Sequence, residues 1–138
     1  MKAWIENVSM WAVQLGHHRM SDNCMLIQIV DPDMEFPTPY HKFTSVHGFK
    51  FLDLERDSVC LHEEWKISEQ VALSLVECLQ TAIDTDQNVI VHCVAGVCRS
   101  GAVCEVGALM GLTDTGTHRI PNIMVKTSMM KVLKLTYD

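Results

Sequence analysis

The chain has 138 residues, 48% of them hydrophobic and 20% charged, which is enough apolar sequence for one domain with a buried core. Its formal net charge of −6 argues against a protein that binds nucleic acid through a basic surface. No apolar run could span a bilayer, the first residues lack the apolar stretch of a signal peptide, and the six cysteines form no CxxC pair. We therefore expect a reduced, cytoplasmic protein that does not bind a membrane.

The first third of the chain predicts a strand, a short helix and a second strand. Residues 4–13 are apolar without a clean period, and we interpret them as a short strand and then a short helix that ends near Gly16, a usual residue after a helix end. His17-His18 follow in a loop, where they lack a nearby third partner as metal ligands. Residues 25–30 predict a buried strand, which Asp31-Pro-Asp33 ends with turn-forming residues.

The middle of the chain predicts a loop, a strand, a helix and a further strand. Three prolines make residues 32–40 an irregular loop, and loops after strand ends line the ligand crevice of open α/β sheets. Residues 46–54 predict a strand. Ser68 suits the N-cap of a helix whose apolar residues recur at helical spacing as far as Ile83. A polar turn then leads into the strand at 89–91, and this strand–helix–strand unit implies parallel strands.

The last third of the chain predicts two helices. The first follows Arg99 and carries small residues that permit close packing against a sheet. A polar break at 113–118 separates it from the second helix, for which Pro121 suits the first turn. Because there is no internal repeat and no linker, we interpret residues 1–138 as a single domain. The elements predict an α/β fold with a central, mostly parallel sheet of four to five strands flanked by helices.

The stretch Val89-Ile-Val-His-Cys-Val-Ala-Gly-Val-Cys-Arg-Ser-Gly101 places a cysteine between a strand end and a helix start. A loop in this position can wrap its backbone N–H groups around an anion, with the positive end of the helix dipole behind them. Arg99 can bind two oxygens of that anion in a planar, bidentate manner. The same positive field lowers the pKa of Cys93 and so favours a nucleophilic thiolate. These residues predict a phosphate held over the sulfur of Cys93.

This loop resembles the signature of the cysteine-dependent protein tyrosine phosphatases, which is Cys, any five residues, Arg, and then Ser or Thr. Here the signature reads Cys93-Val-Ala-Gly-Val-Cys-Arg99-Ser100, and both His92 and the internal Ala95-Gly96 are similar to the dual-specificity branch. The resemblance implies the phosphatase type of phosphate-binding loop between a strand and a helix.

The resemblance extends over most of the chain. The strand Met25–Val30 with Asp31-Pro32, the Phe-x-Asp of Phe51–Asp53, and Pro121-Asn122 all look like the small bacterial and phage dual-specificity-like phosphatases. For a phage protein, the expected location is the cytoplasm of the host.

The resemblance implies a phosphomonoester hydrolase that needs neither metal nor cofactor and acts on a phosphorylated protein or peptide. Cys93 would attack the phosphorus and form a phosphocysteine, which water then hydrolyses, while Ser100 would stabilise the departing sulfur. His92 either orients the loop from the strand end or is a neutral core histidine. The substrate would carry phosphotyrosine, with phosphoserine and phosphothreonine left open. The residues expected to bind the phosphate are Val94, Ala95, Gly96, Val97, Cys98 and Arg99.

The family also uses a carboxylic acid on a neighbouring loop to protonate the leaving group. The sequence offers Asp53 and Asp57. We favour Asp53 because it lies in the Phe-x-Asp pattern, whereas Asp57 lies at a strand exit and is followed by Ser58. Glu63-Glu64 are weaker candidates.

Several alternatives stay open at this level. Cys98 and Cys104 could form a disulfide with a reactive thiolate, although we favour small apolar packing residues. A catalytically weak, phosphatase-like module that binds phosphorylated partners is a second functional class. An arsenate reductase-like enzyme is a third, but that branch usually carries its loop near the chain start. The physiological substrate and the oligomeric state cannot be derived from the sequence.

Overall fold

The computed structural model describes residues 2–54 and 66–137, and in these residues a five-stranded, all-parallel sheet forms the centre of the fold. The strands are β1 (Trp4–Ser9), β2 (Cys24–Val30), β3 (Ser45–Lys50), β4 (Asn88–Cys93) and β5 (Thr113–Asp114), in the spatial order β3-β2-β4-β1-β5. The helices are α1 (Met10–Leu15), α2 (Glu69–Asp84), α3 (Arg99–Met110) and α4 (Ile123–Tyr137). The predicted α/β class, with a parallel sheet flanked by helices, is confirmed.

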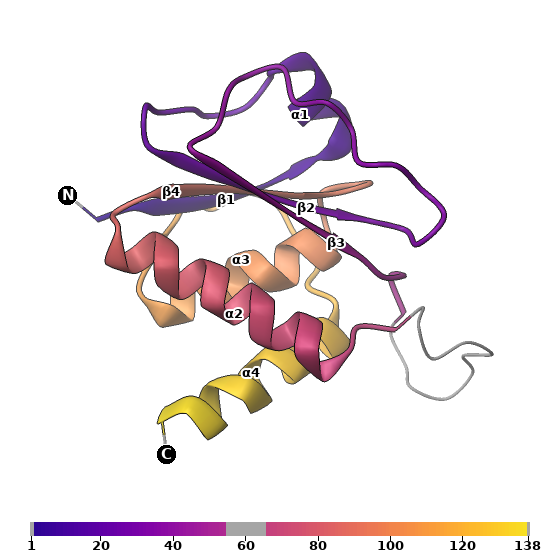
Figure 1. Ribbon diagram of the computed structural model, residues 1–138, viewed down its shortest axis with the longest axis vertical. Coiled ribbons are helices and arrows are strands. Elements are labelled where there is room, and N and C mark those ends of the chain that lie inside the picture. Colours follow the sequence, from indigo (N-terminus) through magenta and orange to yellow (C-terminus); the bar gives the residue numbers. More distant parts are fainter. Residues whose placement is uncertain (1, 55–65, 138) are drawn as a thin grey trace.

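The two faces of the sheet are covered unequally. Figure 1 shows α2, α3 and α4 on one face and the short α1 on the other. The main core lies between the sheet and the three long helices, and α4 packs against α2 and α3. A smaller apolar cluster lies on the opposite face, where Val13 of α1 and Phe43 pack with Leu26 and Ile90.

Local sequence explains the central elements. All seven residues of β2 are buried, because it lies between β3 and β4 and is covered on both faces, and all of them except Gln28 are apolar. Ser68 Oγ accepts a hydrogen bond from Val71 N at 3.0 Å and so caps α2 as predicted. The small residues of α3 allow close packing, since a Cβ at Gly107 would lie 2.8 Å from Ile5 Cδ1.

Three boundaries differ from the prediction. The strand predicted at 46–54 ends at Lys50, and Phe51 stays buried beyond it. The polar break after α3 contains β5, which extends the sheet by pairing with β1. Helix α4 begins after Asn122, whose Oδ1 accepts from Val125 N at 3.0 Å. Because this asparagine caps the helix, Pro121 lies before the first turn and not in it.

The carboxyl ends of β1 and β4 lie side by side, because these two strands are neighbours in the sheet. The helix after β1 lies on one face of the sheet and the helix after β4 lies on the other (Figure 1). In open α/β sheets, ligands bind at such points, outside the carboxyl ends of the strands. In the two described ranges, no helix has the length and apolar character needed to cross a bilayer.

Candidate active site

The loop between β4 and α3 is held from outside by its carbonyl groups. Its hydrogen bonds run to β1, to the start of α1 and to the segment before α4: Val94 O accepts from Met10 N at 3.2 Å, Gly96 O from Asn7 Nδ2 at 2.7 Å, Val97 O from Ile120 N at 3.2 Å, and Cys98 O from Asn122 N at 3.0 Å. In a trans peptide, C=O and N–H point in opposite directions. With these carbonyls turned outward, the N–H groups of the same peptide units point to the inside of the curve. Gly96 N, from the neighbouring peptide unit, donates to Cys93 Sγ at 3.3 Å.

Gly96 lets this loop pack directly on the end of β1. Its φ is +80°, a left-handed conformation that side chains disfavour. A Cβ at this position would lie 2.4 Å from both Ser9 N and Val8 C, which are backbone atoms that cannot turn away. Glycine is therefore required here for two reasons: its positive φ, and the lack of space for a Cβ beside the backbone of β1.

We expect Gly96→Ala to lower the free energy of unfolding by about 3 kcal/mol, because it combines overpacking with backbone strain. Urea unfolding monitored by circular dichroism measures the loss. Gly116→Ala is a matched control, since Gly116 has a φ of +78° but nothing within 4 Å of its added Cβ. The control should cost about 1 kcal/mol. Equal losses in the two variants would show that contact with β1 does not constrain Gly96.

Cys93 is buried at the floor of the loop, and its environment favours the thiolate. Its Sγ lies 3.3 Å from Ser100 Oγ, and α3 begins without a capping side chain. Burial alone raises the pKa of Cys93. Hydrogen bonds from the Ser100 hydroxyl and from the N–H groups of Ser100 and Gly96, together with the charge of Arg99, outweigh burial and lower this pKa below its ordinary value of 9.0.

The other cysteines with a shifted pKa behave in the opposite way. Burial raises the pKa of Cys24 and of Cys104 to about 12 and that of Cys78 to about 11. Cys104 belongs to the main core, and its Sγ lies 3.8 Å from the carbonyl oxygen of Ile5. This placement agrees with the interpretation of Cys104 as a packing residue.

Arg99 is 4% exposed, and one edge of its guanidinium is fully occupied. Nη1 donates to Asp31 Oδ1 at 2.7 Å and to the carbonyl oxygen of Phe51 at 2.6 Å, which uses both of its N–H groups. Nε is buried and has no hydrogen-bond partner among residues 2–54 and 66–137. A buried, unpaired N–H of this kind costs about 1–3 kcal/mol. The Nε–Nη2 edge therefore remains for a bidentate oxyanion, which would relieve that cost.

His92 is fully buried beside Cys93. Its Nε2 lies 3.1 Å from Gln28 Oε1 and its Nδ1 lies 3.3 Å from the carbonyl oxygen of Cys93. Burial lowers the pKa of His92 to about 4, helped by the charge of Arg99 and opposed by the contact with the Cys93 carbonyl. His92 is therefore neutral near pH 7. The two interpretations of His92 are compatible, because a neutral core histidine also contacts the backbone of Cys93.

Asp53 is exposed and is linked to the loop through one residue. Its Oδ1 accepts from Asn122 Nδ2 at 2.5 Å, and the same amide nitrogen donates to the carbonyl oxygen of Leu54 at 2.9 Å. The backbone N–H of Asn122 donates to Cys98, as described above. The structure thus brings Asp53 to the loop, whereas the other acid candidates, Asp57 and Glu63-Glu64, lie outside the described residues.

The sequence interpretation missed the site contacts of Asn7 and Asp31. Asn7 is buried in β1, where its Nδ2 donates to Gly96 O and, at 3.1 Å, to His118 O. A signal was present, because Asn7 shares the core-facing side of β1 with Ile5 and is polar. Asp31 was interpreted as a turn residue and as part of the resemblance, and nothing local indicates its ion pair with Arg99.

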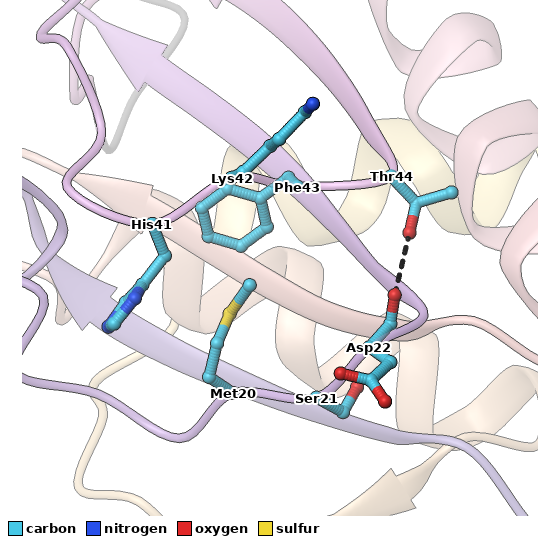
Figure 2. A pocket seen from close by; sticks show the side chains of 7 residues that line it. All are labelled: Met20, Ser21, Asp22, His41, Lys42, Phe43 and Thr44. Atoms are coloured by element: carbon cyan, nitrogen blue, oxygen red, sulfur yellow. Dashed lines mark hydrogen bonds between the residues drawn. The ribbon is translucent and has the colours of Figure 1, made fainter.

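A hollow of about 530 Å³ lies at the other end of the sheet. It is lined by Met20, Ser21, Asp22, His41, Lys42, Phe43 and Thr44, and Figure 2 shows the Thr44 hydroxyl donating to the carbonyl of Asp22. These segments precede β2 and β3, so the hollow faces the amino ends of the strands and does not include Cys93 or Arg99. Across residues 2–54 and 66–137, no three His, Cys, Asp or Glu side chains are grouped to hold a metal ion.

A scan against protein-family models gives no match for the chain, and a search of curated proteins gives none either. The case for a function therefore depends on the geometry of the loop and on its resemblance to the phosphatase signature.

Proposed function

We propose that the chain is a phosphomonoester hydrolase of the cysteine-dependent protein tyrosine and dual-specificity kind, acting in the cytoplasm on a phosphorylated protein or peptide. One observation carries the proposal: Cys93, with its lowered pKa, lies in a loop whose N–H groups face inward beside the open edge of Arg99. A tetrahedral oxyanion matches both kinds of donor. The thiolate beneath it is suited to attack phosphorus.

The reaction follows from this placement in two steps. Cys93 Sγ forms a bond to phosphorus while the bond to the ester oxygen breaks, and Asp53 gives its proton to that oxygen. The loop N–H groups and Arg99 stabilise the charge on the other three phosphate oxygens. Water then attacks the phosphocysteine, Asp53 accepts the proton from that water, and the Ser100 hydroxyl donates to the departing thiolate.

The proposal is tested with p-nitrophenyl phosphate as substrate in the presence of EDTA. We expect turnover without added metal and competitive inhibition by vanadate, which resembles the transition state of phosphoryl transfer. Vanadate or phosphate binding without turnover above background would favour the module that only binds phosphorylated partners. If the protein shows no turnover and binds no oxyanion, the loop is rejected as a phosphate site.

We expect Asp53→Asn to lower kcat by about 10²-fold for a phosphoester with a poor leaving group, because such a group needs a proton as it departs. The effect should be much smaller for p-nitrophenyl phosphate, whose leaving group is stable as an anion. The alkaline limb of the pH–rate profile should disappear in the variant. Asp57→Asn is the comparison, and if only that variant behaves in this way, Asp57 is the acid.

A further inference from the structure

Large apolar side chains are exposed around the loop. Trp11 is 69% exposed, Val94 37%, Ile120 60% and Ile123 65%. We refer to these four residues as the apolar rim. Exposed apolar residues that gather around one feature of a surface commonly mark a binding site.

Backbone hydrogen bonds place the apolar rim against the loop. The residue before Trp11 donates its N–H to the carbonyl of Val94 at 3.2 Å, so the start of α1 adjoins one part of the loop. The N–H of Ile120 donates to the carbonyl oxygen of Val97 at 3.2 Å. The N–H of Asn122, which directly precedes Ile123, donates to the carbonyl oxygen of Cys98 at 3.0 Å. The apolar rim therefore comes from α1, from the loop itself, from the segment before α4 and from the first residue of α4.

Charges near the apolar rim do not favour an acidic partner. Arg119 adjoins Ile120 in the chain, but its guanidinium donates to Glu105 and to Asp114 and is 10% exposed. Asp31 and Asp53 add carboxylates beside the loop. The chain as a whole carries a net charge of −6. Acidic residues next to the phosphorylated residue of a peptide would be repelled by these carboxylates. Apolar residues in the same positions would remove apolar surface of the rim from water.

We propose that the apolar rim binds the ester side of the substrate, and that the preferred substrate is phosphotyrosine within an apolar stretch of peptide. This inference rests on the proposed phosphatase function. With phosphorus over Cys93, the ester oxygen points out of the loop, so the leaving group must pass the apolar rim. An aromatic ring and apolar neighbours fit Trp11 and the two isoleucines. An anionic lipid surface fits poorly, because it attracts basic clusters and repels a chain of negative charge.

The test compares two phosphotyrosine peptides of equal length, one flanked by Leu and Val and the other by Asp and Glu. We expect kcat/KM to be about 10-fold higher for the apolar peptide, a difference of the size that a few apolar contacts supply. Trp11→Ala and the double variant Ile120→Ala/Ile123→Ala should raise KM for the apolar peptide about 5–10-fold. The vanadate inhibition constant should stay unchanged, because the oxyanion does not reach the apolar rim.

Leu109→Ala is the matched control, since Leu109 is 64% exposed on the last turn of α3, away from the loop. It should leave both peptides unaffected, and thermal unfolding checks that each variant is folded. Wild-type protein without turnover of p-nitrophenyl phosphate would overturn the phosphatase function itself. Active protein that treats both peptides alike, rim variants that match Leu109→Ala, or a preference for a phosphorylated lipid in vesicles over both peptides would overturn this inference alone.

Discussion

Replacing Cys93 by serine should abolish turnover of p-nitrophenyl phosphate, with a fall in kcat of about 10⁴-fold or more, while the affinity for inorganic phosphate changes only a few-fold. The hydroxyl of serine is a far weaker nucleophile than a thiolate, and nucleophile removal in enzymes has effects of this order or larger. The groups that we propose to bind phosphate, however, are the loop N–H groups and Arg99, which the substitution leaves in place. Steady-state kinetics and isothermal titration calorimetry separate the two effects.

Cys78→Ser is the control for this substitution. Cys78 is half-buried on α2, and burial raises its pKa to about 11, so it is a thiol at neutral pH and contacts no part of the loop that we describe. We expect wild-type activity in this variant. Full activity in Cys93→Ser would instead assign the chemistry to another group.

The lowered pKa of Cys93 allows a second test of its reactivity, which is its rate of alkylation. Because the pKa lies below 9.0 in the folded protein, the thiolate persists as the pH falls below 9.0, and it is lost only as the pH falls through the lowered value. Iodoacetamide at pH 7 should therefore modify Cys93 well before Cys78, as located by peptide mass spectrometry. Inorganic phosphate should slow the modification by covering the sulfur. Faster reaction at Cys78 would contradict the activation of Cys93.

Local signals in the sequence were sufficient for the strands and for the loop. A run that is apolar apart from Gln28 predicts β2, because a strand covered on both faces accommodates such a run. The spacing of Cys93 and Arg99 is also local, since these residues end β4 and begin α3 on either side of one loop. The end of β3 was placed too late, because apolar residues continue past Lys50 although the ladder does not.

Contacts between distant residues could not be derived in the same way. Asp31 and Arg99 are 68 residues apart, and they meet because β2 lies next to β4 in the sheet. Asn7 and Gly96 are 89 residues apart and meet because β1 is the other neighbour of β4. Strand order is a property of the whole fold and leaves no pattern within either strand. The sequence therefore indicated the proposed nucleophile and phosphate-binding residues, but not the residues that contact them from β1 and from the end of β2.

Arg99 is the second position with a large expected effect. We expect Arg99→Ala to lower kcat/KM for p-nitrophenyl phosphate by about 10³-fold, as for other arginines that stabilise a transferring phosphoryl group. Arg99→Lys should lose about 10²-fold, because lysine keeps the charge but has no planar fork to bind two oxygens. Weaker binding of inorganic phosphate should accompany both losses, as measured by calorimetry. An Arg99→Lys variant with wild-type activity would show that only the charge matters.

Asp31 should act on the reaction through Arg99, by fixing Nη1 so that the Nε–Nη2 edge faces the loop. Asp31→Ala should raise the vanadate inhibition constant about 10-fold, and Asp31→Asn should restore most of that loss, because an amide oxygen still accepts from Nη1 at the position of Oδ1. In an Arg99→Lys background, Asp31→Ala should cost little more, since the lysine has no second edge to orient. Glu6→Gln, which removes the surface ion pair with Arg19, is the control and should leave vanadate inhibition unchanged. Fully additive losses from Asp31→Ala and Arg99→Lys would mean that Asp31 does not position the guanidinium.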